Sequence, residues 1–251
     1  MARQTGIIRL KGTIGDVNFY STSTGGDLAR SAGGGFNSMD NKNKPTMVRV
    51  RENANEFGHC SKVKRVFKLS LAPFLCIRKD GSLHGRMMTL FTKIKSLDRN
   101  NTRGNRKVDM GLETSFGIHL LRSFMFTPAC NVMDVLGASI DYDFLSRRCS
   151  MTNFDVRNIS FPAGATHLAL TLGLLHFDFD TLTYKLRSST PVYIDKMHSA
   201  TSLELSVEDP EVVGMQIAVL GLKFYQEVDS TYYLFKSANA VGVEVLGVLG
   251  K

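Results

Sequence analysis

The sequence predicts an α+β fold in three parts: an N-terminal β-hairpin arm, a helical hairpin and a C-terminal antiparallel β-sandwich. Three observations lead to this prediction. Short strand-like runs separated by glycines open the chain, apolar residues then recur at helical spacing, and alternating apolar residues dominate the second half. The expected parts are an arm with a glycine-rich linker, a basic helical hairpin and a β-sandwich, at residues 1–44, 45–110 and 111–251.

The arm contains two strand-like runs, IIRL at 7–10 and VNFY at 17–20, joined by a loop with two glycines. This pattern predicts a β-hairpin, and LAR at 28–30 predicts a third short strand. The glycine-rich stretch that follows is typical of a flexible linker. An isolated hairpin is marginally stable in water, so this one must pack on something. The residues expected to make that contact are Ile7, Ile8, Leu10, Val17, Phe19 and Tyr20.

Two apolar stripes predict the helical hairpin. Steps of three and four residues, which define one helix face, connect Val50, Ala54, Phe57, Cys60, Val63, Phe67, Leu71 and Phe74. Pro73 is expected to end or kink this helix. After a tight turn at KDGS (79–82), a second stripe comprises Leu83, Met87, Leu90, Phe91, Ile94 and Leu97. The basic connection at 99–109 is the expected domain boundary.

The remaining chain predicts a β-sandwich. In the strand at 168–179, the apolar residues change parity near Leu174 and Leu175, and a β-bulge would explain the change. Leu203, Leu205 and Val207 alternate in another strand. A long hairpin is expected over 214–236, with its turn at Asp229 and Ser230, and a last strand over 240–248.

No motif identifies a reaction. The glycine-rich stretch lacks the lysine of a phosphate-binding loop, and His59 and Cys60, being adjacent on a helix, point about 100° apart and do not form a nucleophile pair. His176, Asp178 and Asp180 have metal-ligand spacing, as have Asp141 and Asp143, but exposed strand faces explain both patterns. No catalytic residue, metal or cofactor is predicted, and we expect a protein that is not an enzyme.

The charge is unevenly distributed. Residues 1–110 hold 21 Lys and Arg against 8 Asp and Glu, a net +13, whereas residues 111–251 hold 10 against 15, a net −5. This asymmetry favours either a polyanionic partner or attraction between copies. The basic surface is expected to comprise Arg49, Arg51, Lys62, Lys64, Arg65 and Lys68.

Compartment signals are few. The N-terminus lacks the pattern of a secretory signal, no apolar run is long enough to span a membrane, and the four cysteines are far apart. We therefore expect reduced thiols and either a cytoplasmic location or a place in a phage-like particle.

Four phrases carry a resemblance: GIIRLKGTIGDVNFY, RVRENANEFG, FPAGATHLAL and LKFYQEVDSTYYLFKSANAVGV. Similar phrases occur in the same order in a family of Bacteroidetes proteins of about this length, and the chain resembles that family along nearly all of its length. The resemblance brings no assigned activity with it. It implies that arm, helical hairpin and β domain form one recurrent unit.

Together these features predict a structural subunit that self-assembles into a filament, tube or shell, its arm adding strands to a neighbouring copy. A nucleic-acid-binding or phage-type accessory protein that uses the basic residues of 49–107 is the alternative. A third hypothesis is a β-sandwich that binds a ligand such as a carbohydrate, although the chain has no Trp.

Overall fold

The chain divides into two compact units, residues 1–51 and residues 52–251, and the second is called the body. The predicted boundary between residues 110 and 111 lies inside the body. The computed structural model describes residues 2–22, 25–32, 42–76, 80–208 and 214–250.

Two sequence predictions fall on other residues. Most of the predicted linker, residues 33–41, lies outside the described residues, and so does Lys79 of the predicted turn. In the described part of the chain, no helix is both long and apolar enough to cross a membrane.

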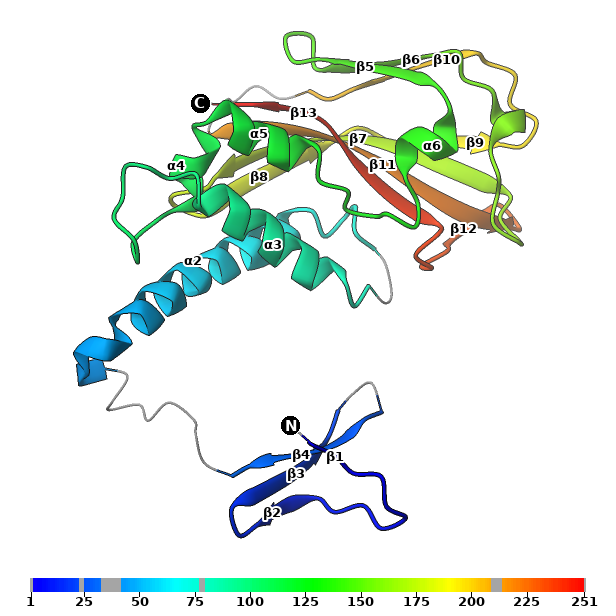
Figure 1. The fold of residues 1–251 in the computed structure, drawn as a ribbon. Helices are drawn as coiled ribbons and strands as arrows, with labels where there is room; N and C mark the ends of the chain where they lie inside the picture. Colours follow the sequence, from blue (N-terminus) through cyan, green and yellow to red (C-terminus); the bar gives the residue numbers. More distant parts are fainter. Residues whose placement is uncertain (1, 23–24, 33–41, 77–79, 209–213, 251) are drawn as a thin grey trace. The chain divides into compact units, whose positions relative to one another are not determined.

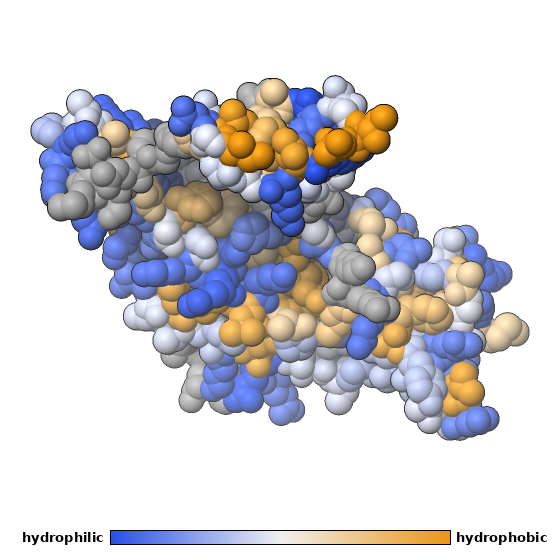
Figure 2. All heavy atoms as spheres, turned by 90° about the horizontal axis from the view of Figure 1, so that it is seen from below, coloured by the Kyte–Doolittle hydropathy of each residue, from blue (hydrophilic) through white to orange (hydrophobic). Residues whose placement is uncertain are grey.

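The arm folds as a four-stranded antiparallel sheet, sheet A (Figure 1). Its strands, in spatial order, are β1 (Ala2–Arg3), β4 (Asp27–Ser31), β3 (Val17–Ser21) and β2 (Gly12–Ile14). The predicted third strand is therefore confirmed as part of β4. Apolar side chains remain on the surface in this unit, and a group of such residues is visible in Figure 2.

The predicted first strand at 7–10 is wrong. These residues form the loop between β1 and β2, and the hairpin partner of β3 is β2. A two-residue turn at Gly15 and Asp16 places Ile14 opposite Val17. Gly15 has φ +53, the positive value that glycine supplies at the first position of such turns. The tight turn thus fixes the pairing of β3 with residues 12–14, and this pairing does not extend back to the IIRL run at 7–10.

The helices whose bounds the structure describes include 3₁₀ turns before α2 and in the β region. In chain order they are η1 (Pro45–Met47), α2 (Val48–Ser70), α3 (Leu83–Lys95), α4 (Val108–Leu112), α5 (Ser115–Arg122), α6 (Val132–Leu136) and η2 (Val156–Asn158). Helices α2 and α3 confirm the predicted helical hairpin. They run antiparallel, because Glu56 pairs with Lys95 while Lys64, further along α2, contacts His84.

Helices α4, α5 and α6 correct the expectation that the chain after residue 110 is almost entirely strand. Their caps are local. Thr114 Oγ1 accepts a hydrogen bond from Gly117 N (3.0 Å), and Asn131 Oδ1 accepts one from Met133 N (3.0 Å). Gly137 ends α6 at φ +57, as a C-terminal glycine commonly does. These helices have at most eight residues, too short to show a repeating apolar stripe.

Two antiparallel sheets make up the β region. Sheet B has the order β10 (Ser202–Ser206), β6 (Arg148–Thr152), β5 (Ser139–Asp143). Sheet C comprises β7 (His167–Asp178), β8 (Thr183–Ser188), β9 (Val192–Asp195), β11 (Met215–Val228), β12 (Thr231–Leu234) and β13 (Val241–Leu249). β11 pairs with β7 on one side and with β13 and β12 on the other, and this confirms the predicted long hairpin and last strand.

Sheet C is covered on both faces, by sheet B on one and by the helices on the other (Figure 1). The core shared with sheet B contains Leu168, Leu170, Leu172 and Leu174. The core shared with the helices contains Leu175, Phe177 and Phe179. This is the sandwich-like α+β architecture that the sequence predicts.

The predicted bulge at Leu174 and Leu175 is wrong. β7 pairs with β11 in unbroken register from His167 to Phe177. The apolar parity changes because the strand is buried on different faces along its length: on the sheet B side at first and on the helix side toward its end. The register does shift elsewhere, between Ala218 and Val219, where β11 pairs with β13.

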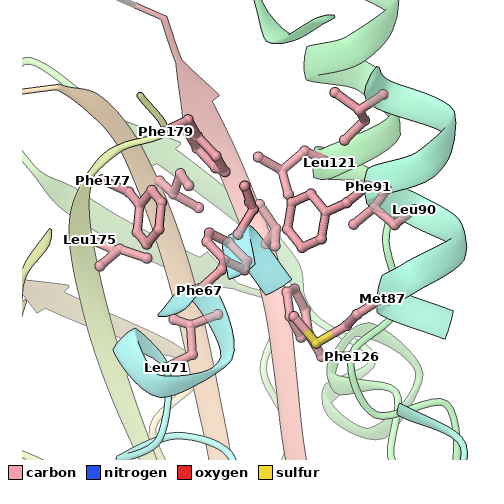
Figure 3. Packing of buried hydrophobic residues seen from close by; sticks show 14 of the residues in the cluster. Phe67, Leu71, Met87, Leu90, Phe91, Leu121, Phe126, Leu175, Phe177 and Phe179 are labelled. Carbon is pink, nitrogen blue, oxygen red and sulfur yellow. The ribbon is translucent and has the colours of Figure 1, made fainter. Parts of the chain in front are cut away.

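Phe67 of α2 is the central residue of the helix-side core (Figure 3). Its ring lies edge-on to Phe91 of α3, with centroids 5.6 Å apart, and edge-on to Phe177 of β7 at 5.2 Å. It also stacks on Phe179 at 5.7 Å. Such aromatic pairs add to the stabilisation from burial itself. The two predicted helices are therefore fixed to the sheet through one aromatic cluster.

Candidate assembly surface

None of the described residues of the arm is buried. Its large apolar side chains are among the most exposed of the described residues. The exposed fractions are 103% for Ile7, 81% for Ile8, 41% for Leu10, 60% for Ile14 and 37% for Val17. Sheets need a buried face for stability in water. The arm therefore has an apolar surface that its own residues do not cover.

The register of sheet A divides the predicted arm residues between its two faces. Ile14 lies opposite Val17, and Phe19, two residues further along β3, shares their face. Tyr20 points to the other face, where Arg30 lies 5.5 Å from the centre of its ring. The apolar face is thus built from Ile14, Val17 and Phe19. The sequence prediction missed Ile14, which the tight Gly15–Asp16 turn could have revealed.

Ile7 and Ile8 form the tip of the loop between β1 and β2, here called the tip. Gln4 closes the base of this loop, because its Oε1 accepts from Leu10 N (2.8 Å) and its Nε2 donates to Leu10 O (3.2 Å). Arg9 forms an ion pair with Asp27 of β4. Hydrogen bonds from Ser21 and Arg9 lower the pKa of Asp27. Polar contacts fix the ends of the loop and leave the two isoleucines projecting.

The edges of sheet A are short. β2 has three residues and β1 has two, and the order of the sheet leaves their outer sides as its edges. Edge strands present backbone N–H and C=O groups that can pair with another chain. In the body, β5 and β10 are the edges of sheet B. Among the described strands, β1, β2, β5 and β10 are thus edge strands of sheets A and B.

The six residues of the predicted basic surface all belong to α2. Arg49 and Arg51 lie in its first turn, and Arg51 donates to Lys44 O (3.1 Å). Lys62, Arg65 and Lys68 are exposed beside the buried stripe. Burial, together with the neighbouring charges of Lys68 and Arg65, lowers the pKa of Lys64, whose Nζ lies 2.8 Å from His84 Nδ1. The predicted basic surface is thus the solvent-facing side of one helix, α2.

The apolar stripe of α2 is only partly buried. Cys60, Val63 and Phe67 are fully buried, whereas Phe57 is 58% exposed. In the turn before Cys60 the buried position is taken by Glu56, which forms an ion pair with Lys95 and accepts from Gly104 N (2.8 Å). The expectation that Ala54 and Phe57 face the core is wrong: both are exposed, because the polar loop after α3 packs against Glu52 and Glu56 instead.

His59 and Cys60 have separate structural roles. His59 Nε2 accepts a hydrogen bond from Val108 N (3.0 Å), and burial lowers the pKa of this imidazole. Cys60 Sγ donates to Phe91 O (3.6 Å), and burial raises the pKa of this thiol. All four cysteines are free thiols. Cys60 is therefore a buried packing residue whose thiol stays protonated near neutral pH.

Asp178 and Asp143 cap turns in the structure, and Asp141 and Asp143 lie on the exposed face of β5, as expected. Asp178 Oδ1 accepts from Asp180 N (3.0 Å), and Asp180 lies beyond the strand, in an ion pair with Lys107 at 3.0 Å. The expected alignment of His176, Asp178 and Asp180 on one strand face is therefore wrong. Asp143 accepts from Ser146 N (3.0 Å). Among the described residues, no group of three or more His, Cys, Asp or Glu could hold a metal ion.

Tyrosines gather where β9 and β12 extend sheet C. Tyr193 stacks on Tyr232 at 4.3 Å, and both rings lie close to Tyr225. Burial raises the pKa of Tyr225 to about 12. Each of the Tyr193 and Tyr232 rings covers one face of the other. We therefore interpret the cluster as side-chain packing that covers this end of sheet C.

The fold and this surface define a class: an α+β protein with an N-terminal β-arm, in which no described residue is buried, and a body whose main sheet is covered by helices and a second sheet. Comparisons of the chain with protein-family models, curated proteins and solved structures find no match. A function must therefore be argued from the chain's own residues.

Proposed function

We propose that this protein is a non-enzymatic structural subunit that self-assembles, with its arm adding to a neighbouring copy. The assembly would be a filament, tube or shell. The observation that carries the proposal is a four-stranded sheet in which no described residue is buried and whose tip isoleucines are almost fully exposed.

The energetics favour covering the arm. Full burial of one isoleucine side chain contributes about 1.5–3 kcal/mol. The arm exposes five large aliphatic side chains, in which the tip and Ile14 have the largest exposed fractions. Such a surface gains much more from a protein partner than from water.

The charge distribution supports another copy as that partner. Residues 1–110 carry a net +13 and residues 111–251 a net −5, so basic residues of the first part of one copy would attract acidic residues of the second part of another. A contact between two different surfaces is heterologous, and it produces rings when it closes and helical polymers when it does not. This is how a single arm could give an extended assembly.

The experiment compares the full chain with a variant lacking residues 1–36. Light scattering coupled to size exclusion measures the mass, and electron microscopy shows the shape. We expect a large assembly from the full chain and a folded, smaller species from the variant, with circular dichroism confirming that the body is intact. If the variant assembles as well as the full chain, the proposal fails.

A further inference from the structure

A pocket of about 440 Å³ opens in the body between α4, α5 and the ends of β7, β11 and β13. It is lined by Asp109, Met110, Leu112, Glu113, Ile118, Phe177, Phe179, Met215 and Gly250. Phe177, Phe179, Leu112 and Met215 are at most 6% exposed and so form a buried apolar floor. The pocket therefore suits apolar side chains of moderate size.

The polar lining of the pocket is acidic. Asp109 and Glu113 contribute two carboxylates, and the described lining residues include no cation. Asp109 Oδ1 is buried and has no hydrogen-bond partner among the described residues. An acceptor in this position is costly unless a donor reaches it. Asp109 interacts electrostatically with His59 and Lys107, but neither side chain donates a hydrogen bond to Oδ1. A fitting ligand is thus apolar at its end and carries a cation or N–H donors beside that end.

The arm contains a segment with this chemistry. The tip presents Ile7 and Ile8 at 103% and 81% exposure, and Lys11 lies three residues after Ile8, whereas Arg9 is paired with Asp27. Two isoleucine side chains match an apolar floor, and the Lys11 cation matches the acidic lining. The tip and the pocket belong to the same chain, so two copies of this protein are sufficient to form the contact.

We infer that the tip of one copy inserts into this pocket of a neighbouring copy, with Ile7 and Ile8 on the apolar floor and Lys11 near Glu113. The inference rests on the proposed function and adds the receiving surface to it. The contact joins two different surfaces, so it propagates from copy to copy. A free apolar amine or the tip of the same chain would be other occupants, and the test separates them.

The test is a charge exchange scored by light scattering on the full chain. Ile8→Asp should abolish assembly, because a carboxylate would enter an acidic pocket. Glu113→Lys and Lys11→Glu should each weaken assembly by about tenfold, within the range of couplings between contacting residues. The double variant Lys11→Glu/Glu113→Lys should restore most of it. Glu113 is exposed, so its replacement leaves the core intact. Leu145→Asp, at a residue 94% exposed on the turn after β5, is the matched control and should have no effect.

A second measurement locates the contact. Copies carrying Ile8→Cys and one affinity tag are mixed with copies carrying Ile118→Cys and another tag, and the mixture is oxidised. We expect a disulfide between differently tagged chains, and none when Met197→Cys, at a residue 88% exposed, replaces Ile118→Cys.

The outcomes separate the inference from the proposed function. If deletion of the arm or Ile8→Asp prevents assembly but the charge exchange has no effect and no cross-link forms, the pocket is overturned and the proposed function stands. If deletion of the arm has no effect, the proposed function fails. A cross-link within a chain carrying both Ile8→Cys and Ile118→Cys, without any between chains, overturns the intermolecular contact. Displacement of the tip by an apolar amine such as hexylamine would support the pocket chemistry.

Discussion

Gly173 of β7 lies beneath the ring of Phe74, and a Cβ atom added at Gly173 would be 2.5 Å from Phe74 Cζ. Gly221 of β11 stands in the same relation to Phe74 Cδ1, again at 2.5 Å. Phe74 is 2% exposed. The end of the first helical segment therefore packs directly on the backbone of two central strands, and this contact requires glycine for close approach rather than for backbone freedom.

Gly173→Ala should lower the free energy of unfolding by about 1–3 kcal/mol, because the new methyl group displaces a buried ring. Urea denaturation measures the change. Gly85→Ala is the control: Gly85 lies in α3 with open space around its Cα, so this change should stabilise the protein by up to about 1 kcal/mol. Equal effects of the two changes would contradict the packing described here.

Glu56 and Lys95 form an ion pair while only 5% and 8% exposed. Replacing Glu56 by Ala leaves the lysine charge buried without a partner and should cost about 3–5 kcal/mol of stability. The double change Glu56→Leu/Lys95→Met should cost less than that single change, since no buried charge remains. Chemical denaturation of the parent and the two variants measures these differences. A double variant less stable than Glu56→Ala would refute this account.

Asp98 makes stability depend on pH. Burial alone would raise the pKa of this carboxyl, but hydrogen bonds from the backbone N–H groups of Lys107, Asn101 and Asn100 hold it below its ordinary value of 3.8. Because the pKa of Asp98 is lower in the folded protein than in the unfolded chain, its ionised carboxylate stabilises the fold at pH values above the unfolded pKa. This stabilisation is lost as the pH falls through the folded pKa. Asp98→Asn should therefore be less stable than the parent at pH 7, and the difference should shrink in acid. A difference that stays constant down to about pH 2 would argue against this origin.

Salt should weaken assembly. Attraction between the basic residues of 1–110, net +13, and the acidic residues of 111–251, net −5, would act through exposed charges. Screening shortens its range from about 8 Å at physiological ionic strength to about 3 Å at 1 M. Light scattering across a sodium chloride series measures the effect. Assembly that is unchanged at the highest salt would mean that apolar contacts such as the tip dominate.

The basic face of α2 should contact protein rather than nucleic acid. Binding of DNA and RNA, single-stranded and duplex, should be micromolar or weaker at about 150 mM salt, because few phosphate contacts are available to one helix face. Reversal of Lys64, Arg65 and Lys68 to glutamate should instead disrupt assembly. Sub-micromolar binding that the same reversal abolishes would favour the nucleic-acid alternative.

Local pattern was sufficient for much of the fold. The recurrence of Cys60, Val63 and Phe67 predicts α2 because helical spacing is a property of neighbouring residues alone. The hairpin of β11 and β12 follows from two apolar runs around Asp229 and Ser230, which both adopt positive φ. The exposed isoleucines of the arm could also be singled out, since no local partner exists to bury them.

Tertiary structure decided the rest, because burial depends on residues far away in the chain. The parity change at Leu174 and Leu175 reflects which face of one regular strand is covered, and the coverings come from sheet B and from helices that are distant in sequence. The pocket at Asp109 combines residues from α4, β7 and β11, whose proximity no local spacing encodes. The sequence by itself determined the helical hairpin, the long β-hairpin and the apolar character of Ile7 and Ile8, because these depend on neighbouring residues. Only the tertiary structure placed the two isoleucines in an exposed loop and brought together an apolar, acidic pocket, because burial depends on residues far apart in the chain.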